Sequence, residues 1–221
     1  MSDIGTLNEG PLHVALKAHY AEPGDEYEVP LDRFVIDIKR GRQLIEVQTV
    51  SFASMGNKLD HLLSEYKVLL VHPVAVSTYL DRPGKALRKS PKKGSIYNLF
   101  EELVSVPTLI DHPNLTIDVV LTSVIKHQRH DDKARRGRGG YRTVNRSLRE
   151  LLGTHRFECA HDLLALLPTA DLPARFTTAD MANVAGVPRD IAQRMAYCFR
   201  PLELITEHNR TKAGIVYSLT T

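Results

Sequence analysis

Apolar and polar positions alternate along the first part of the chain in short blocks, separated by breaks that contain Gly or Pro. Apolar residues at helical spacing predict helices over 11–20 and 57–66. Runs rich in Val, Ile, Leu and Phe predict strands over 26–30, 34–38, 44–52 and 67–71. The order is therefore helix, three strands, helix, strand, which indicates a domain of the α/β class.

Further along, the pattern predicts a helix over 95–106 and a strand over 115–125 at the edge of the same sheet. Residues 126–142 break it with many basic residues and three glycines. We interpret 131–142 as a basic linker. Either Arg135, Arg136 and Arg138 contact phosphates, or the segment is only a charged, solvated connector between the domains. The predicted domains are 1–130 and 143–221.

Beyond the linker, the pattern becomes helical. It predicts helices over 143–152 and 159–167, a third with a capped start at Thr177, and a fourth over 189–199. The third and fourth are separated by a turn at Gly186. Two apolar segments then flank a polar turn at 207–212, which predicts a terminal hairpin with a basic tip.

Composition excludes several classes of protein. The formal net charge is +3, and Cys159 and Cys198 are the only cysteines, so no disulfide framework is indicated. No segment has the length and apolar character of a membrane span, and we expect a cytoplasmic protein. Neither a Gly-rich phosphate loop nor a Gly-x-Ser-x-Gly elbow is present. His155, Cys159 and His161 lack both a fourth ligand and the spacing of a zinc finger.

Two carboxylates in the apolar hairpin stand out. Asp37 interrupts one apolar arm, and Glu46 lies on the other. Burying a carboxylate is unfavourable unless it is paired or bound to a metal. Carboxylates on adjacent strands supply the oxygen ligands that hard divalent cations prefer, so the hairpin is a candidate cation site.

An acidic residue on one strand followed by Glu46-Val47-Gln48 on the next resembles the PD-(D/E)xK nuclease superfamily, which has the restriction-endonuclease-like fold. The resemblance covers roughly the first third of the chain. It implies a mixed sheet with flanking helices, Mg²⁺ or Mn²⁺ bound by Asp37 and Glu46, and Glu9 as an extra acidic group on the first helix. Gln48 stands where the family usually has lysine, and Lys58 on the following helix is the candidate replacement.

The segment from Phe176 to Leu219 resembles a winged helix-turn-helix domain. In such domains the second helix of the pair enters the major groove. The resemblance implies DNA contacts from the helix residues Arg189, Asp190, Gln193 and Arg194, and from the wing residues Arg210 and Lys212. A winged helix that docks on proteins is the alternative.

Together, these features predict a divalent-metal-dependent DNA nuclease, acting as an endonuclease or exonuclease with a winged-helix DNA-binding domain. In this mechanism a bound cation activates water for phosphodiester hydrolysis, with the Val47 carbonyl and Gln48 orienting the water. The main alternative is a nuclease-like protein that binds DNA or regulates without cutting, since glutamine lacks the positive charge of lysine. The third function class is a protein-interaction scaffold. The sequence is compatible with a homodimer.

Overall fold

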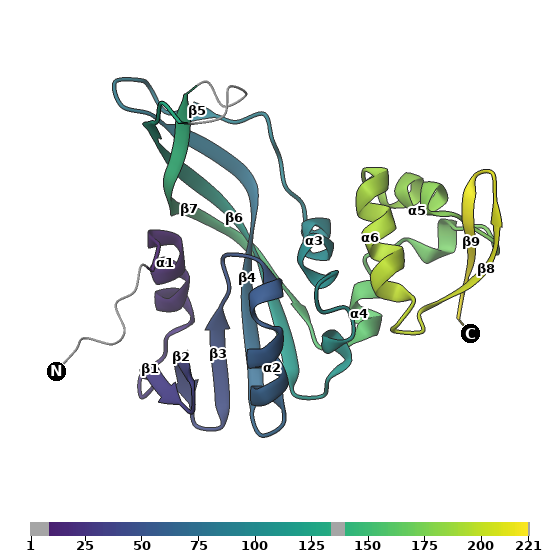
Figure 1. Ribbon diagram of the computed structural model, residues 1–221, viewed down its shortest axis with the longest axis horizontal. Helices are drawn as coiled ribbons and strands as arrows, with labels where there is room; N and C mark the ends of the chain where they lie inside the picture. The colour runs from purple at the N-terminus through teal and green to yellow at the C-terminus, as the bar shows by residue number, and fades with distance from the viewer. Residues whose placement is uncertain (1–8, 134–139, 221) are drawn as a thin grey trace. The chain divides into compact units, whose positions relative to one another are not determined.

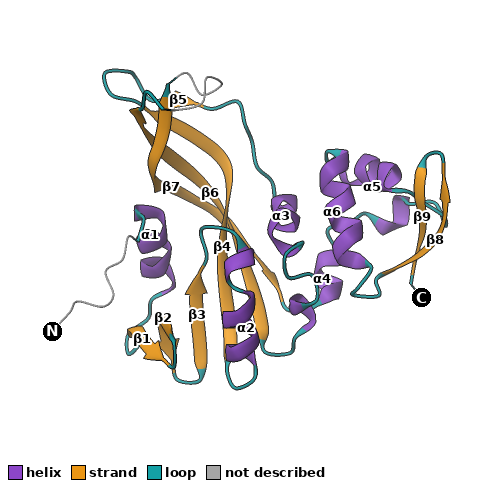
Figure 2. Ribbon diagram, in the orientation of Figure 1, coloured by secondary structure: helices purple, strands orange, loops and turns teal. Residues whose placement is uncertain are grey.

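The computed structural model describes residues 9–133 and 140–220. A large sheet carries most of the strands, and a two-stranded sheet lies near the C-terminus (Figures 1 and 2). In spatial order, the large sheet contains β1 (Glu26–Leu31), β2 (Phe34–Arg40), β3 (Gln43–Val47), β4 (Lys67–Asp81), β6 (Leu115–His130) and β7 (Tyr141–Phe157), with β5 (Arg88–Lys89) paired to β4. The small sheet pairs β8 (Ile205–Thr211) with β9 (Gly214–Leu219).

The α-helices are α1 (Pro11–Tyr20), α2 (Gly56–Leu63), α3 (Leu99–Leu103), α4 (Ala160–Leu164), α5 (Thr178–Ala185) and α6 (Arg189–Phe199). The predicted α/β class is confirmed, and the first six elements follow the predicted order of helix, three strands, helix, strand. Among the helices of the described residues, none is long and apolar enough to cross a membrane.

The described residues form two compact units. The first is drawn from 1–49, 70–95 and 119–155, and the second from 50–69, 96–118 and 156–221. The first unit therefore contains α1, β1, β2, β3, β5 and most of β4, β6 and β7. The second contains α2 to α6 and the small sheet. Of the segment 131–142, interpreted above as a linker, Tyr141 and Arg142 belong to β7, and residues 134–139 lie outside the described residues.

The large sheet is mixed. β2 is antiparallel to β1 and to β3, and the pairing joins Tyr27 to Ile38 and Ile38 to Ile45. Between β4 and β6 the polar contacts advance in the same direction along both strands: Thr122 Oγ1 donates to the Val74 carbonyl at 3.1 Å, and His127 Nδ1 lies 2.8 Å from Asp81 Oδ2. Contacts that advance together identify β4 and β6 as a parallel pair.

Three sequence predictions were wrong in this sheet. The predicted helix at 143–152 is part of β7. Its apolar residues Val144, Leu148, Leu151 and Leu152 have helical spacing, but pairing along the sheet overrides that local pattern. Strand β6 extends to His130 and lies between β4 and β7 rather than at the edge. Strand β4 continues through Pro73, because proline removes one backbone donor and the following residues are strand formers.

The helical part of the second unit begins with a well-capped helix. The Thr177 hydroxyl accepts from the backbone N–H groups of Ala179 and Asp180, and Asp180 accepts from the Thr177 N–H, which is a capping box. Gly186 ends α5 at a φ of 62°, a left-handed conformation that favours glycine. Both features confirm the predicted start and end of this helix.

Helix α6 follows with the predicted bounds and buries Ile191, Met195 and Phe199. The Phe199 ring packs edge-on against Phe100 of α3, with ring centroids 5.5 Å apart. The chain then enters the β8–β9 hairpin, and a single bridge joins Phe176 to Tyr217 of β9. The predicted terminal hairpin is therefore present, with a shorter turn between Thr211 and Gly214.

Candidate functional site

Three acidic residues occupy one row across β1, β2 and β3. Glu28 and Asp37 lie between the paired positions Tyr27–Ile38 and Val29–Ile36. Glu46 follows Ile45, which is paired with Ile38. Because side chains alternate between the faces of a strand, this register places all three on the same face of the sheet. We call Glu28, Asp37 and Glu46 the carboxylate row.

Asp37 is held at the centre of this row. Its Oδ2 atom accepts the backbone N–H of Val47 at 2.7 Å and lies 3.2 Å from Nε2 of His13. The side chain is 14% exposed. Burial favours the neutral acid, but the bonds from His13 and Val47 and the positive charges of His13 and Lys17 outweigh it and lower the pKa of Asp37. Asp37 is therefore ionised at neutral pH.

Helix α1 covers the row with two basic side chains. Nδ1 of His13 lies 3.4 Å from Oε1 of Glu9, while its other ring nitrogen faces Asp37. Lys17 donates to Glu9 at 2.8 Å and also to Glu28. Glu9 lies two residues before α1, and His13 and Lys17, each four residues further on, continue from it along one face of the helix.

The charges of this cluster reinforce one another. Burial alone would lower the pKa of His13, but the hydrogen bond and charge of Asp37 and the charge of Glu9 raise it. Burial would likewise lower the pKa of Lys17, but its bonds to Glu28 and Glu9 raise it. The cations therefore compensate carboxylates that the fold brings together.

Glu9, His13 and Asp37 each offer a ligand atom, and these atoms all lie within 4.8 Å of one another. Among the residues that the structure describes, this is the group of His, Cys, Asp and Glu side chains that is close enough to share a metal ion. Two carboxylates and an imidazole suit a divalent ion such as Mn²⁺, which accepts oxygen and nitrogen ligands. We call these three residues the metal cluster.

The predicted site residues are only partly brought together. Asp37 and Glu9 belong to the metal cluster, whereas Glu46 shares the face of Asp37 and is 5% exposed but does not belong to the group. The Gln48 backbone is fixed: its N–H donates to the Val71 carbonyl, and its carbonyl accepts from Nδ1 of His72, both at 2.8 Å. Lys58 lies half-buried on α2, in the second unit.

The sequence analysis missed His13, Lys17 and Glu28. The signal for the first two was present, since Glu9, His13 and Lys17 have the spacing of one helical face. The zinc alternative has no support from the geometry: His155, Cys159 and His161 form no metal-capable group in the described parts of the chain. Cys159 instead caps α4, where the Asp162 carboxylate accepts its backbone N–H at 3.1 Å.

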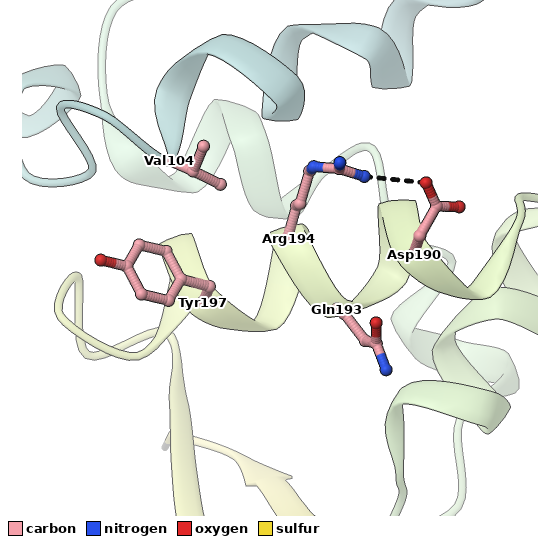
Figure 3. A pocket seen from close by; sticks show the side chains of 5 residues that line it. All are labelled: Val104, Asp190, Gln193, Arg194 and Tyr197. Atoms are coloured by element: carbon pink, nitrogen blue, oxygen red, sulfur yellow. Dashed lines mark hydrogen bonds and ion pairs between the residues drawn. The ribbon is translucent and has the colours of Figure 1, made fainter. Parts of the chain in front are cut away.

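Three of the four α6 residues predicted to contact DNA line a cavity of about 350 Å³; its lining is Val104, Asp190, Gln193, Arg194 and Tyr197. Arg194 donates to Asp190 at 2.9 Å, and in Figure 3 both side chains extend toward the side of Val104. Gln193 points to the opposite side of the helix in the same view. Part of the positive charge predicted to face DNA is therefore compensated within α6.

The remaining predicted contacts are in the wing and the basic segment. Arg189 donates to the Ala213 carbonyl at 3.0 Å, which ties the start of α6 to the tip of the hairpin. Arg210 on β8 and Lys212 in the turn are exposed. Arg135, Arg136 and Arg138 lie outside the described residues.

Comparisons with known proteins identify a family and a relative. Residues 10–158 match a family described as a domain of unknown function (DUF8091). A protein of Treponema pallidum (strain Nichols), which carries the name uncharacterized protein, is 33% identical over 191 residues, covering 81% of this chain and 74% of that protein. No solved structure matches. The family region includes His13, Lys17 and the carboxylate row, and begins one residue after Glu9.

Proposed function

We propose that the chain, which belongs to the family of the domain of unknown function DUF8091, hydrolyses DNA phosphodiester bonds with the help of a divalent cation. The observation that carries the proposal is the convergence of Glu9, His13 and Asp37, whose ligand atoms lie within 4.8 Å of one another. They come from the start of α1, from the residue two positions before it and from a strand distant in sequence, so the fold itself assembles the group. The donor set favours Mn²⁺ or Mg²⁺, and the imidazole of His13 favours Mn²⁺ over Mg²⁺.

The chain's own residues would position the reactants. The Val47 N–H orients the Asp37 carboxylate and His13 holds its other side, and binding of a cation would require a neutral His13 imidazole. A bound cation would supply Lewis-acid stabilisation of the phosphate and lower the pKa of its water. Glu46, buried on the same face of the sheet, would add a further carboxylate beside Asp37.

The order of elements supports a restriction-endonuclease-like fold as part of this proposal. Helix α1, the antiparallel strands β1, β2 and β3, helix α2 and strand β4 follow one another as the resemblance implies. Gln48 still stands in place of the usual lysine. We assign the missing positive charge to Lys17 rather than Lys58, because Lys17 bonds to Glu9 and its charge acts on Asp37.

The C-terminal elements support a winged-helix domain that holds DNA. Helices α5 and α6 are joined by a tight turn at Gly186 and followed by a hairpin, and the Phe176–Tyr217 bridge adds a third short strand position. In this proposal the contacts to DNA come from Arg189, Gln193, Arg194, Arg210 and Lys212, with phosphate contacts from Arg135, Arg136 and Arg138. Cytoplasmic action and homodimer formation remain predictions.

A cleavage assay tests the proposed activity. Wild type, Asp37→Asn and the control Asp60→Asn are incubated with labelled single-stranded and duplex DNA in Mg²⁺, Mn²⁺ or EDTA. Asp60 is an exposed acid on α2, so its variant removes the same charge elsewhere. We expect cleavage by wild type and Asp60→Asn with a cation present, and none by Asp37→Asn or with EDTA. Cleavage that survives Asp37→Asn would contradict the proposal.

One observation favours the alternative, a nuclease-like protein that binds DNA without cutting it. The His13–Asp37 contact and the Lys17 bonds to Glu9 and Glu28 already compensate most of the clustered carboxylates. Such pairs stabilise a fold without any metal. DNA binding in the same assay, with no cleavage in Mg²⁺ or Mn²⁺, would favour this alternative.

A further inference from the structure

Positive charge is concentrated in one part of the first unit. We call residues 79–95, 126–133 and 140–150 the basic arm; they follow the end of β4, the β5 segment, and the adjoining ends of β6 and β7. The arm contains twelve Lys and Arg residues against four Asp and Glu residues, whereas the whole chain has a net charge of only +3. Its basic residues are Arg82, Lys85, Arg88, Lys89, Lys92, Lys93, Lys126, Arg129, Lys133, Arg142, Arg146 and Arg149. Such an asymmetry is the electrostatic signature of a polyanion-binding surface.

Two arginines of the arm are stacked on tyrosine rings. The Arg149 guanidinium carbon lies 3.9 Å from the centre of the Tyr79 ring, and that of Arg82 lies 4.2 Å from the centre of the Tyr141 ring. Lys85 also approaches the Tyr141 ring, at 5.5 Å. Stacking holds the planar guanidinium in one orientation, so less entropy is lost when it binds a ligand.

Hydrogen bonds fix the strands between the two stacks. His127 joins Asp81 to Ser147, with both ring nitrogens 2.8 Å from their partners. The Nε atom of Arg82 donates to Oε1 of Gln128 at 2.8 Å. These contacts tie β4, β6 and β7 together, and they make the stacks part of a rigid platform rather than a mobile tail.

The tip of the platform is hollowed. A cavity of about 500 Å³ is lined by Arg129, His130, Asp131, Asp132, Lys133, Arg142 and Val144. Arg142 lies 3.3 Å from Asp131, and His130 packs edge-on against the Tyr141 ring. The recess beside one of the two stacks is thus lined by three basic residues together with Asp131 and Asp132.

We propose that the basic arm binds a single-stranded nucleic acid. An exposed guanidinium backed by a tyrosine presents an open planar surface on which an unpaired base can stack, and its N–H edge can bind the adjacent phosphate. Tyr79 and Arg82 are three positions apart, so their side chains leave opposite faces of the chain and each stack offers a binding surface of its own. The bases of a duplex are stacked on one another, whereas an unpaired strand presents base faces that a guanidinium can cover.

This site lies on strands other than those that carry the metal cluster, and the binding requires no cation. The proposal therefore adds to the proposed function a preference for unpaired strands. Its test is made with EDTA present, so that loss of cleavage and loss of binding are separate results.

The experiment is fluorescence anisotropy with a labelled mixed-sequence DNA strand and with the duplex formed by its complement. Arg82→Lys combined with Arg149→Lys keeps both charges but removes both planar stacks. We expect this variant to bind the single strand roughly tenfold or more weakly, since stacking contributes about 1–3 kcal/mol per base, and to leave duplex binding unchanged.

A second pair of variants separates charge from stacking. Arg142→Gln with Arg146→Gln removes two charges from the arm, and Lys67→Gln with Arg175→Gln removes two exposed charges outside it. We expect the first variant to reduce the salt slope of single-strand binding by about 0.7 for each phosphate that the arm no longer neutralises, and the second to leave the slope unchanged. Circular dichroism confirms that each variant is folded.

Four results would overturn the proposal. One is the absence of single-strand binding at low salt. Another is single-strand affinity that does not change when both stacks are removed, and the third is an equal loss of single-strand and duplex affinity in that variant. Binding to anionic phospholipid vesicles without binding to DNA would also overturn it, because it would assign the charge of the arm to a lipid surface.

Discussion

The Nε2 atom of His13 lies 3.2 Å from the Oδ2 atom of Asp37, and the same oxygen accepts the Val47 N–H at 2.7 Å. This contact joins α1 to the β2–β3 hairpin at the centre of the carboxylate row. It also places an imidazole and an ionised carboxylate side by side, with Glu9 on the other edge of the ring. Without a metal, the His13–Asp37 contact is an ion pair. With a metal, these two side chains would supply two of the three proposed ligands.

The positive charge in the cluster gives a prediction that separates Lys17 from Lys58. Lys17→Met removes the ammonium group that bonds to Glu9 and Glu28, and we expect metal-dependent cleavage to fall by about 10²-fold, as when one preorganised donor is removed from an active site. Lys17→Arg keeps the charge and retains most of the activity. The measurement is the initial rate of DNA cleavage in Mn²⁺.

Lys58→Met is the matched control, because it removes a lysine from α2 in the other unit. We expect it to cleave at the wild-type rate. The assignment of Lys17 would be wrong if Lys58→Met lost activity and Lys17→Met, folded by circular dichroism, kept it.

The ion pair within α6 predicts a gain of function. Asp190 neutralises Arg194 at 2.9 Å, and this bond lowers the pKa of Asp190, so the acid is ionised at neutral pH. Asp190→Ala should therefore free Arg194 and remove a repulsive charge, and we expect DNA to bind severalfold more tightly with a steeper salt dependence. Arg194→Ala should weaken binding. If neither change altered the affinity measured by anisotropy, α6 would not face DNA.

The ion pair between Arg40 and Asp25, in the loop before β1, predicts that the free energy of unfolding depends on pH. Arg40 donates from two nitrogens to the two carboxylate oxygens of Asp25, each at 2.8 Å. The bonds from Arg40 lower the pKa of Asp25 from 3.8 to about 2. Because folding lowers this pKa, the pair stabilises the fold above about pH 4, and the contribution is lost as the pH falls through about 2.

Urea unfolding of wild type and Asp25→Asn at a series of pH values checks this prediction. We expect wild type to be the more stable protein at neutral pH, and the difference in unfolding free energy to shrink as the pH falls from about 4 to about 2. A difference that stayed constant across this range would show that Asp25 contributes by packing or by uncharged hydrogen bonds.

Much of the first unit follows from local pattern. The isolated carboxylate of Asp37 in an apolar strand marked the centre of the site, because a buried acid needs a partner. The partners were harder to identify, since the spacing of Glu9, His13 and Lys17 is equally typical of a solvated helix face. Only the packing of α1 over the carboxylate row shows that this face is covered.

The largest error concerns β7, and its cause is physical. Val144, Leu148, Leu151 and Leu152 have the spacing of an amphipathic helix, and the Gly-rich segment before them is typical of a linker. In the structure Tyr141–Phe157 pairs along the sheet as β7, and nonlocal hydrogen bonds outweigh the local preference. That pairing also brings Arg149 to Tyr79, a contact that no local pattern could indicate.

Manganese binding tests the central claim most directly. Titration of Mn²⁺ into the wild-type protein, followed by electron paramagnetic resonance of the free ion, reports binding without any substrate. We predict one site in wild type, at least tenfold weaker binding in Asp37→Asn and in His13→Gln, and unchanged binding in Asp60→Asn. Equal Mn²⁺ affinity in wild type and Asp37→Asn, or no binding by folded wild type, would contradict the assignment of Glu9, His13 and Asp37 as a metal site.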